Sequence, residues 1–165
     1  AKWWKILQPY FKEYALKKSD IPTGSGRIPF NQESADLLAE YNPPVISFHF
    51  GLPADSLLAQ IKNLGAYVLA SATNLEEAKW LEANGTDAII EAGGHRGIFL
   101  NNDLSTQVAT FELLKQIVGI SKLPVIAAGG ISTANDVAKA LSLGASAVQI
   151  GTAYLLCTET KTSQI

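Results

Sequence analysis

Residues 91–97 are the stretch of the chain best suited to chemistry, with the sequence Glu-Ala-Gly-Gly-His-Arg-Gly. Gly93 and Gly94 let a ligand approach the backbone closely, and their N–H groups can donate to it. His95 follows at once, and an imidazole with an ordinary pKa of about 6.5 can act as a base or as a donor at neutral pH. The spacing alone equally fits a glycine turn with a solvated histidine beside it.

The only other histidine of the chain is His49, which lies between two phenylalanines in residues 47–51. Taken alone, it could equally be a hydrogen-bonded core histidine. Both histidines, however, come directly after apolar runs that have the character of strands. If the strands belong to a βα barrel, their C-terminal ends share one face, and we expect His49 and His95 on that face.

Two glycine turns follow the last two apolar runs, at Gly129-Gly130 and at Gln149-Ile150-Gly151-Thr152. Free N–H groups at the start of a helix favour an anion, most often phosphate, and the final two strands of a barrel are where such sites form. An ordinary tight βα turn is the alternative for each. The sequence has no P-loop pattern, and two histidines without a nearby acidic cluster do not support a metal site.

The elements that must position these residues repeat one unit. Apolar runs begin at residues 45, 67, 88, 125 and 147, at spacings of roughly 22, 21, 37 and 22 residues, which suit tight βα units. The runs do not alternate polar and apolar residues, as expected of parallel strands covered on both faces. The long interval after residue 88 contains residues 91–107, and an oversized loop in a compact repeat is usually functional.

Helical patterns lie between these runs. Residues 73–76 and 133–136 have the spacing of a capping box, with Thr73 and Thr133 as the capping residues. We expect each helix to end at a glycine in the left-handed conformation, namely Gly65, Gly85, Gly119 and Gly144.

This pattern predicts an α/β fold: a partial (β/α)₈ TIM barrel of about five βα units. A flavodoxin-like open sheet also has five strands, but the paired turns at the last two strands favour the barrel. We expect a single domain over residues 1–165. Residues 1–42 would be an N-terminal helical extension rich in aromatic residues, and residues 43–165 the βα repeats.

Composition limits the class of protein. Hydrophobic residues make up 47% and charged residues 17%, with a net charge of -2, which indicates a globular chain without the basic surface that nucleic acids require. No apolar run approaches the ~20 residues of a membrane helix. The single cysteine, Cys157, fits a reducing compartment, so we expect a cytoplasmic protein.

Four segments taken together resemble the nitronate monooxygenase family, once called 2-nitropropane dioxygenases. The resemblance runs from about residue 43 to residue 160, and its segments are residues 47–53, 91–97, 124–131 and 149–156. It implies a TIM barrel that holds FMN noncovalently and oxidises alkyl nitronates with molecular oxygen, giving a carbonyl compound and nitrite. The chemistry would come from the flavin, and the protein would supply orientation and charge.

The resemblance also implies roles for single residues. His95 matches the catalytic histidine, and His49 matches a second histidine of the substrate pocket. Positions that match flavin contacts are Gly93, Gly129, Gly130, Gln149, Gly151 and Thr152.

The chain departs from the family pattern in three ways. Family members have further strands before the position of residue 45 and a further region after that of residue 165. The chain therefore reads as the C-terminal part of a barrel. Its exposed strand edges would favour a homo-oligomer. Ile90 also leads directly to Glu91, without the short Ala-Gln-Gly segment that brings a glutamine to the flavin. Two alternatives therefore stay open: an FMN-dependent NAD(P)H reductase of the enoyl-acyl-carrier-protein or quinone type, and a truncated homologue without activity.

Overall fold

The computed structural model describes residues 2–21, 28–93, 105 and 107–161. All five predicted strands begin at the predicted residue, because each starts where a continuous apolar run follows a helix and its turn. The elements in chain order are α1 (Lys2–Glu13), η1 (Lys18–Asp20), α2 (Gln32–Tyr41), β1 (Val45–Phe48), α3 (Asp55–Asn63), β2 (Tyr67–Ala72), α4 (Leu75–Ala83), β3 (Ala88–Ala92), α5 (Thr110–Val118), β4 (Val125–Ala128), α6 (Ala134–Ser142), β5 (Ala147–Gln149) and η3 (Thr152–Leu156).

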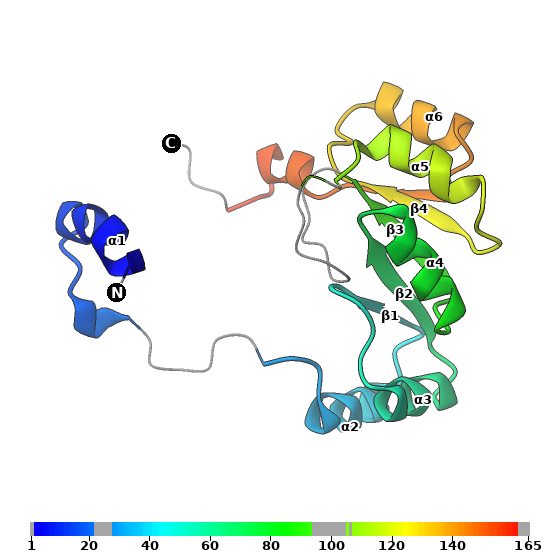
Figure 1. Cartoon of the computed structure of the whole chain (residues 1–165), viewed down its shortest axis with the longest axis horizontal. Coiled ribbons are helices and arrows are strands. Elements are labelled where there is room, and N and C mark those ends of the chain that lie inside the picture. The colour runs from blue at the N-terminus through cyan, green and yellow to red at the C-terminus, as the bar shows by residue number, and fades with distance from the viewer. Residues whose placement is uncertain (1, 22–27, 94–104, 106, 162–165) are drawn as a thin grey trace.

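The strands form one parallel sheet in the order β1-β2-β3-β4-β5, so each strand pairs with the next one along the chain. A flavodoxin-like sheet would place its first strand inside the order, as in 2-1-3-4-5. The sequential order is that of a barrel segment, and Figure 1 shows the covering helices on the outer side of the curved sheet.

The two faces of the sheet differ in burial. Side chains on the helix-facing side, such as Val68, Ile89 and Ala127, are fully buried and form the core with the inner faces of α3, α4 and α5. On the opposite side Val45 and Tyr67 remain 51% and 67% exposed. That second face corresponds to the inside of a barrel, where further strands would cover it.

The predicted capping boxes had different outcomes. At α6 the prediction is confirmed, since Thr133 accepts the Asp136 N–H and the Asp136 carboxylate accepts the Thr133 N–H. At α4 the prediction is wrong by one residue. Asn74 caps the helix by accepting the Glu77 N–H, and Thr73 instead donates its N–H and O–H to the Glu77 carboxylate.

The glycines predicted to follow the helices have the left-handed conformation, with one exception. Gly65, Gly85 and Gly144 have φ between 79° and 99°, as predicted for the residue after a helix. Gly119 does not, because its φ of -68° continues the helical turn, and the N–H groups of Ile120 and Ser121 close that turn on Ile117.

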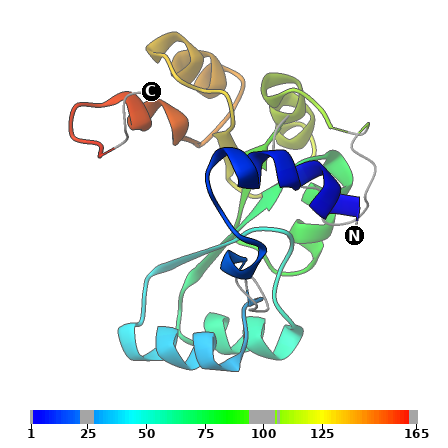
Figure 2. The same cartoon turned by 90° about the vertical axis from the view of Figure 1, so that its left-hand side faces the viewer.

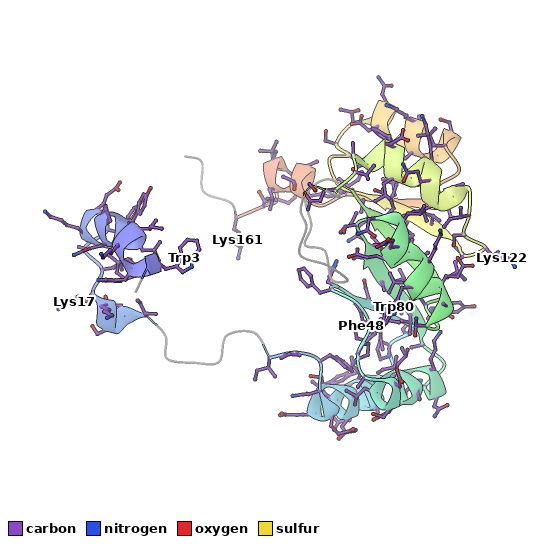
Figure 3. All side chains as sticks on the ribbon, in the orientation of Figure 1. Trp3, Lys17, Phe48, Trp80, Lys122 and Lys161 are labelled. Carbon is purple, nitrogen blue, oxygen red and sulfur yellow. The ribbon has the colours of Figure 1, made fainter. Side chains whose placement is uncertain are left out.

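The N-terminal helices occupy separate positions. Helix α2 lies beside α3, where Gln32 and Asp36 both hydrogen-bond to Gln60 (Figure 2). Helix α1 lies apart from the sheet, and Figure 3 shows its Trp3 far from Phe48 on β1. Within the described ranges no helix combines the length and apolar character needed to cross a membrane.

Candidate functional site

A cavity of about 660 Å³ lies where β4 and β5 end. It brings together five of the predicted flavin positions from two separate turns, together with neighbours that the sequence analysis did not select. The lining residues are Gly129, Gly130, Ile131, Ser132, Gln149, Gly151, Thr152, Ala153 and Leu156. The two glycine turns therefore lie together, as the sequence predicted.

The backbone of the turns is shaped to approach a ligand. Gly129 and Gly130 have φ of 104° and 68°, a region that side chains with a Cβ rarely adopt. A Cβ at Gly130 or Gly151 would meet no atom within 4 Å, so open space lies beside both residues. These residues fit the phosphate end of a flavin nucleotide, which needs close backbone N–H donors and no intervening side chain.

Asp136 limits what helix α6 can offer to an anion. Its carboxylate accepts the N–H groups of Ser132 and Thr133 at 3.2 and 2.9 Å and the Thr133 hydroxyl at 2.8 Å. These hydrogen bonds, above all those from Thr133, lower the pKa of Asp136. The prediction that the N–H groups at this helix start are free is therefore wrong for residues 132 and 133, and the cavity's other backbone groups are left for a phosphate.

His49 directly follows β1, and its side chain is exposed in this chain. Its Nδ1 lies 2.6 Å from the hydroxyl of Ser71, a buried residue of the adjacent strand β2. The register pairs Phe48 with Ala70, which brings the two side chains to the same end of the sheet. The hydrogen bond holds the imidazole in one orientation, and the hydroxyl can serve as its donor or its acceptor.

We expect Ser71→Ala to release the His49 ring from this contact. In the ¹⁵N spectrum of the ring, the His49 Nδ1 signal should shift in the variant, since a neutral hydrogen bond of about 1 kcal/mol is lost there. Ser71→Thr keeps the hydroxyl and should resemble the wild type. Because the chain has two histidines, His49→Gln assigns the signals. Identical ring spectra in Ser71→Ala and the wild type would contradict the assigned contact.

A second cavity, of about 610 Å³, is lined by residues 28–30 and 48–54, including His49. It is mainly apolar and includes the edge-to-face pair of Phe30 and Phe48, whose ring centres are 5.2 Å apart. Phe50 lines it with a φ of 62°, a strained conformation for an aromatic residue. An apolar pocket with one imidazole in its lining suits a ligand that has an apolar part and one polar group.

Four residues meet where β3 and β4 end against the start of α5, and we call Glu91, Gly93, Thr110 and Gly129 the β3–β4 joint. The Gly93 N–H donates to Glu91 Oε1 at 2.7 Å. Thr110 Oγ1 donates to the carbonyl of Gly129 at 2.9 Å and lies 3.4 Å from that of Gly93. The joint thus connects the segment that leads to His95 with the glycine turn of the 660 Å³ cavity.

The carboxyl of Glu91 is fully buried on the helix-facing side of the sheet. Burial raises its pKa from 4.5 to about 7, and hydrogen bonds from the N–H groups of Gly93 and Ala128 partly oppose this rise. Its Oε2 has no hydrogen-bond partner in the described part of the chain. The side chain therefore changes charge near neutral pH, which an exposed glutamate does not do.

The predicted catalytic residue, His95, and its neighbour Gly94 lie outside the described residues. Gly93 is described and belongs to the β3–β4 joint rather than to the cavity lining. Sequence reasoning missed Ser71 and Thr110 as partners of site residues. A serine one residue before the end of an apolar strand, beside the strand of His49, was the available signal for Ser71. Over residues 2–21, 28–93, 105 and 107–161, no group of three or more His, Cys, Asp or Glu side chains could hold a metal ion.

A family model described as nitronate monooxygenase matches residues 2–165. The chain belongs to the nitronate monooxygenase family. It is 45% identical over 168 residues to a nitronate monooxygenase of Paraburkholderia phytofirmans, covering 96% of this chain and 44% of the relative. It is 38% identical over 163 residues to one of Pseudomonas aeruginosa, covering 95% and 46%.

Solved structures agree with the family assignment. A nitroalkane oxidase from Streptomyces ansochromogenes superimposes with a TM-score of 0.77 at 32% identity, covering 92% of this chain and 45% of that chain. FabK from Thermotoga maritima, in its M276A form, gives 0.69 at 31% identity, covering 81% and 43%. These neighbours are TIM-barrel enzymes, so the partial barrel is confirmed. This member of the nitronate monooxygenase family spans just under half the length of the curated relatives it matches.

Proposed function

We propose that the protein to which these residues belong uses FMN to oxidise alkyl nitronates with molecular oxygen, giving a carbonyl compound and nitrite. The observation that carries this proposal is the shared cavity of Gly129–Ser132 and Gly151–Ala153. Its glycine backbone offers an anion a close approach from two sides. When bound, the flavin supplies the redox chemistry.

The residues of the chain bind the flavin and orient the substrate. Backbone N–H groups of the two turns hold the phosphate, and Gln149 reaches the same cavity from the end of β5. His49, fixed by Ser71, borders the apolar pocket and faces the polar end of a small substrate. His95 accepts a proton from a neutral nitroalkane or holds the anionic nitronate by charge.

Two other functions compete with this one. An FMN-dependent NAD(P)H reductase of the enoyl-acyl-carrier-protein or quinone type would use the same phosphate turns, whereas an inactive homologue would bind no flavin. The match to the nitronate monooxygenase family favours the nitronate reaction, and the apolar pocket lined by His49 has room for an alkyl group.

The test begins with flavin content. The intact protein should be yellow as purified, or become so with added FMN, and should consume oxygen with an alkyl nitronate in the absence of NADH. Oxidation of NADH without nitronate turnover would select the reductase. A colourless protein that fails to bind FMN would leave the inactive homologue.

We expect His95→Ala to lower nitronate turnover by about 100-fold while FMN stays bound, since a positioned proton acceptor typically contributes that much. Turnover is measured as oxygen uptake on samples matched for flavin absorbance. Lys122→Ala, a change at an exposed residue remote from both cavities, is the matched control and should keep full activity. Unchanged turnover in His95→Ala would refute the assigned role.

A further inference from the structure

The β3–β4 joint has no room to relax at its centre. A Cβ at Gly93 would lie 2.6 Å from the backbone N and Cα of Thr110, and one at Gly129 would lie 3.0 Å from the Gly93 carbonyl. Backbone atoms of β3, β4 and α5 are therefore in contact at this point. A displacement of Gly93 must displace Thr110 or Gly129, because packed backbones have no free volume to absorb it.

The carboxyl of Glu91 is the titratable group within this contact. Its Oε1 is held by Gly93, the Ala128 N–H beside Gly129 also donates to the carboxyl, and Oε2 is buried without a partner in the described residues. The carboxylate form has acceptors on both oxygens, so it leaves Oε2 unsatisfied and attracts the nearby N–H donors more strongly than the acid form does. Gain or loss of the proton therefore changes the force on Gly93.

Charged groups on the elements packed against β3 do not offset this change. The β2 strand carries only Tyr67, at the opposite end, and β4 carries no titratable residue. On α4, the buried Glu77 carboxylate accepts the N–H and O–H of Thr73. On α5, Glu112 and Lys115 are exposed. Desolvation is therefore the largest influence on the pKa of Glu91, larger than that of any charged group.

We propose that Glu91 and Thr110 are positioning residues that couple the segment leading to His95 to the glycine turn at Gly129, with the Glu91 proton setting the arrangement of both. This inference rests on the proposed function for its significance, since the two coupled segments would hold the catalytic histidine and the FMN phosphate. The coupling itself involves only residues of the chain and needs no flavin. It predicts that both segments respond to one titration.

The experiment follows the backbone ¹⁵N–¹H signals of Gly93 and Gly129 from pH 5 to pH 9 in the intact, flavin-free protein. In the wild type both signals should move with one common midpoint near pH 7. In Glu91→Gln neither should move over this range. His95→Gln should leave the titration of both glycines in place, which excludes the histidine as its source.

Thr110 is tested with a matched pair of variants. Thr110→Val removes the hydroxyl at nearly constant shape, so Gly93 should still titrate while the response of Gly129 falls to the part that passes through the Ala128 N–H. Thr110→Ser keeps the hydroxyl and should behave as the wild type. In a separate measurement, Thr110→Val should weaken FMN binding about fivefold, the equivalent of one neutral hydrogen bond, and Thr110→Ser should stay within about twofold.

Three outcomes would overturn the proposal: a Gly93 signal that is flat with pH, a titration that persists in Glu91→Gln, or an undiminished Gly129 response in Thr110→Val. If Glu91→Gln does not fold, the wild type and the Thr110 pair still decide. The titration requires no flavin. A protein that binds no FMN therefore contradicts the proposed function without affecting this result.

Discussion

Gly93→Ala should lower the free energy of unfolding by at least about 3 kcal/mol, since overpacking of a filled core typically costs 1–3 kcal/mol and rigid surroundings raise the cost. The added methyl group would lie 2.6 Å from two backbone atoms of Thr110 and 2.8 Å from Glu91 Oε1. Neither neighbour can give way easily, because Thr110 begins α5 and the Glu91 carboxyl is fully buried. Urea denaturation at pH 7 measures the loss.

Gly151→Ala is the matched control for this prediction. Its φ of -122° suits any residue, and a Cβ there meets nothing within 4 Å. Its unfolding free energy should stay within about 0.5 kcal/mol of the wild type, the usual range for surface changes. Its methyl group would extend into the space beside the second glycine turn, so FMN binding should weaken. Equal stability losses in the two variants would show that crowding at Gly93 is not the cause.

Glu91→Gln should be more stable than the wild type at pH 8 by about 3 kcal/mol and of similar stability at pH 4.5. The size follows from the rise in the pKa of Glu91 from 4.5 to about 7. Glutamine keeps an acceptor for the Gly93 N–H and carries no charge. Urea denaturation of both proteins at four or five pH values between 4.5 and 8 gives the difference directly.

The sign follows from proton uptake. Between pH 4.5 and 7 the unfolded chain has lost the Glu91 proton while the folded protein keeps it, so the wild type loses stability as pH rises through this window. Below the window, both states are protonated and the full contribution is present. Above it, both states are ionised and the loss is complete. A difference between the two proteins that stays constant with pH would contradict the buried, titrating carboxyl.

Asp136→Asn gives a control of opposite sign. Hydrogen bonds from Thr133 and Ser132 lower the pKa of Asp136, so this carboxylate stabilises the fold above its ordinary pKa and loses that effect as pH falls. The variant should therefore be less stable than the wild type at neutral pH, and the gap should narrow in acid. Together, Glu91→Gln and Asp136→Asn distinguish a pH-dependent stability caused by burial from one caused by hydrogen bonding.

Most of the fold could be predicted from the sequence because its signals are local. The strands begin at residues 45, 67, 88, 125 and 147, where continuous apolar runs follow a helix and its turn. The clustering of the turns at Gly129 and Gly151 also followed, because successive parallel strands end at one edge of a sheet.

Contacts between side chains on different elements could not be predicted. The pairing of Ser71 with His49 depends on the register of β1 against β2, and the contact of Thr110 with Gly129 depends on where α5 begins. The choice of Asn74 over Thr73 as the cap of α4 was decided by Glu77, whose buried carboxylate takes both hydrogen-bond donors of Thr73. Each outcome rests on tertiary geometry that residue spacing does not contain.

The sequential strand order has a consequence for how the sheet assembles. Partner residues are 22, 19, 36 and 21 positions apart in the four strand pairs, as for Val45 with Tyr67 and Ile89 with Val125. Since loop-closure entropy grows only as the logarithm of loop length, the longest closure costs roughly 0.6 kcal/mol more than the shortest. No pairing then has to wait for a distant part of the chain. Folding can start at any βα unit and spread to its neighbours in both directions, with the step between β3 and β4 only about twofold slower than the others.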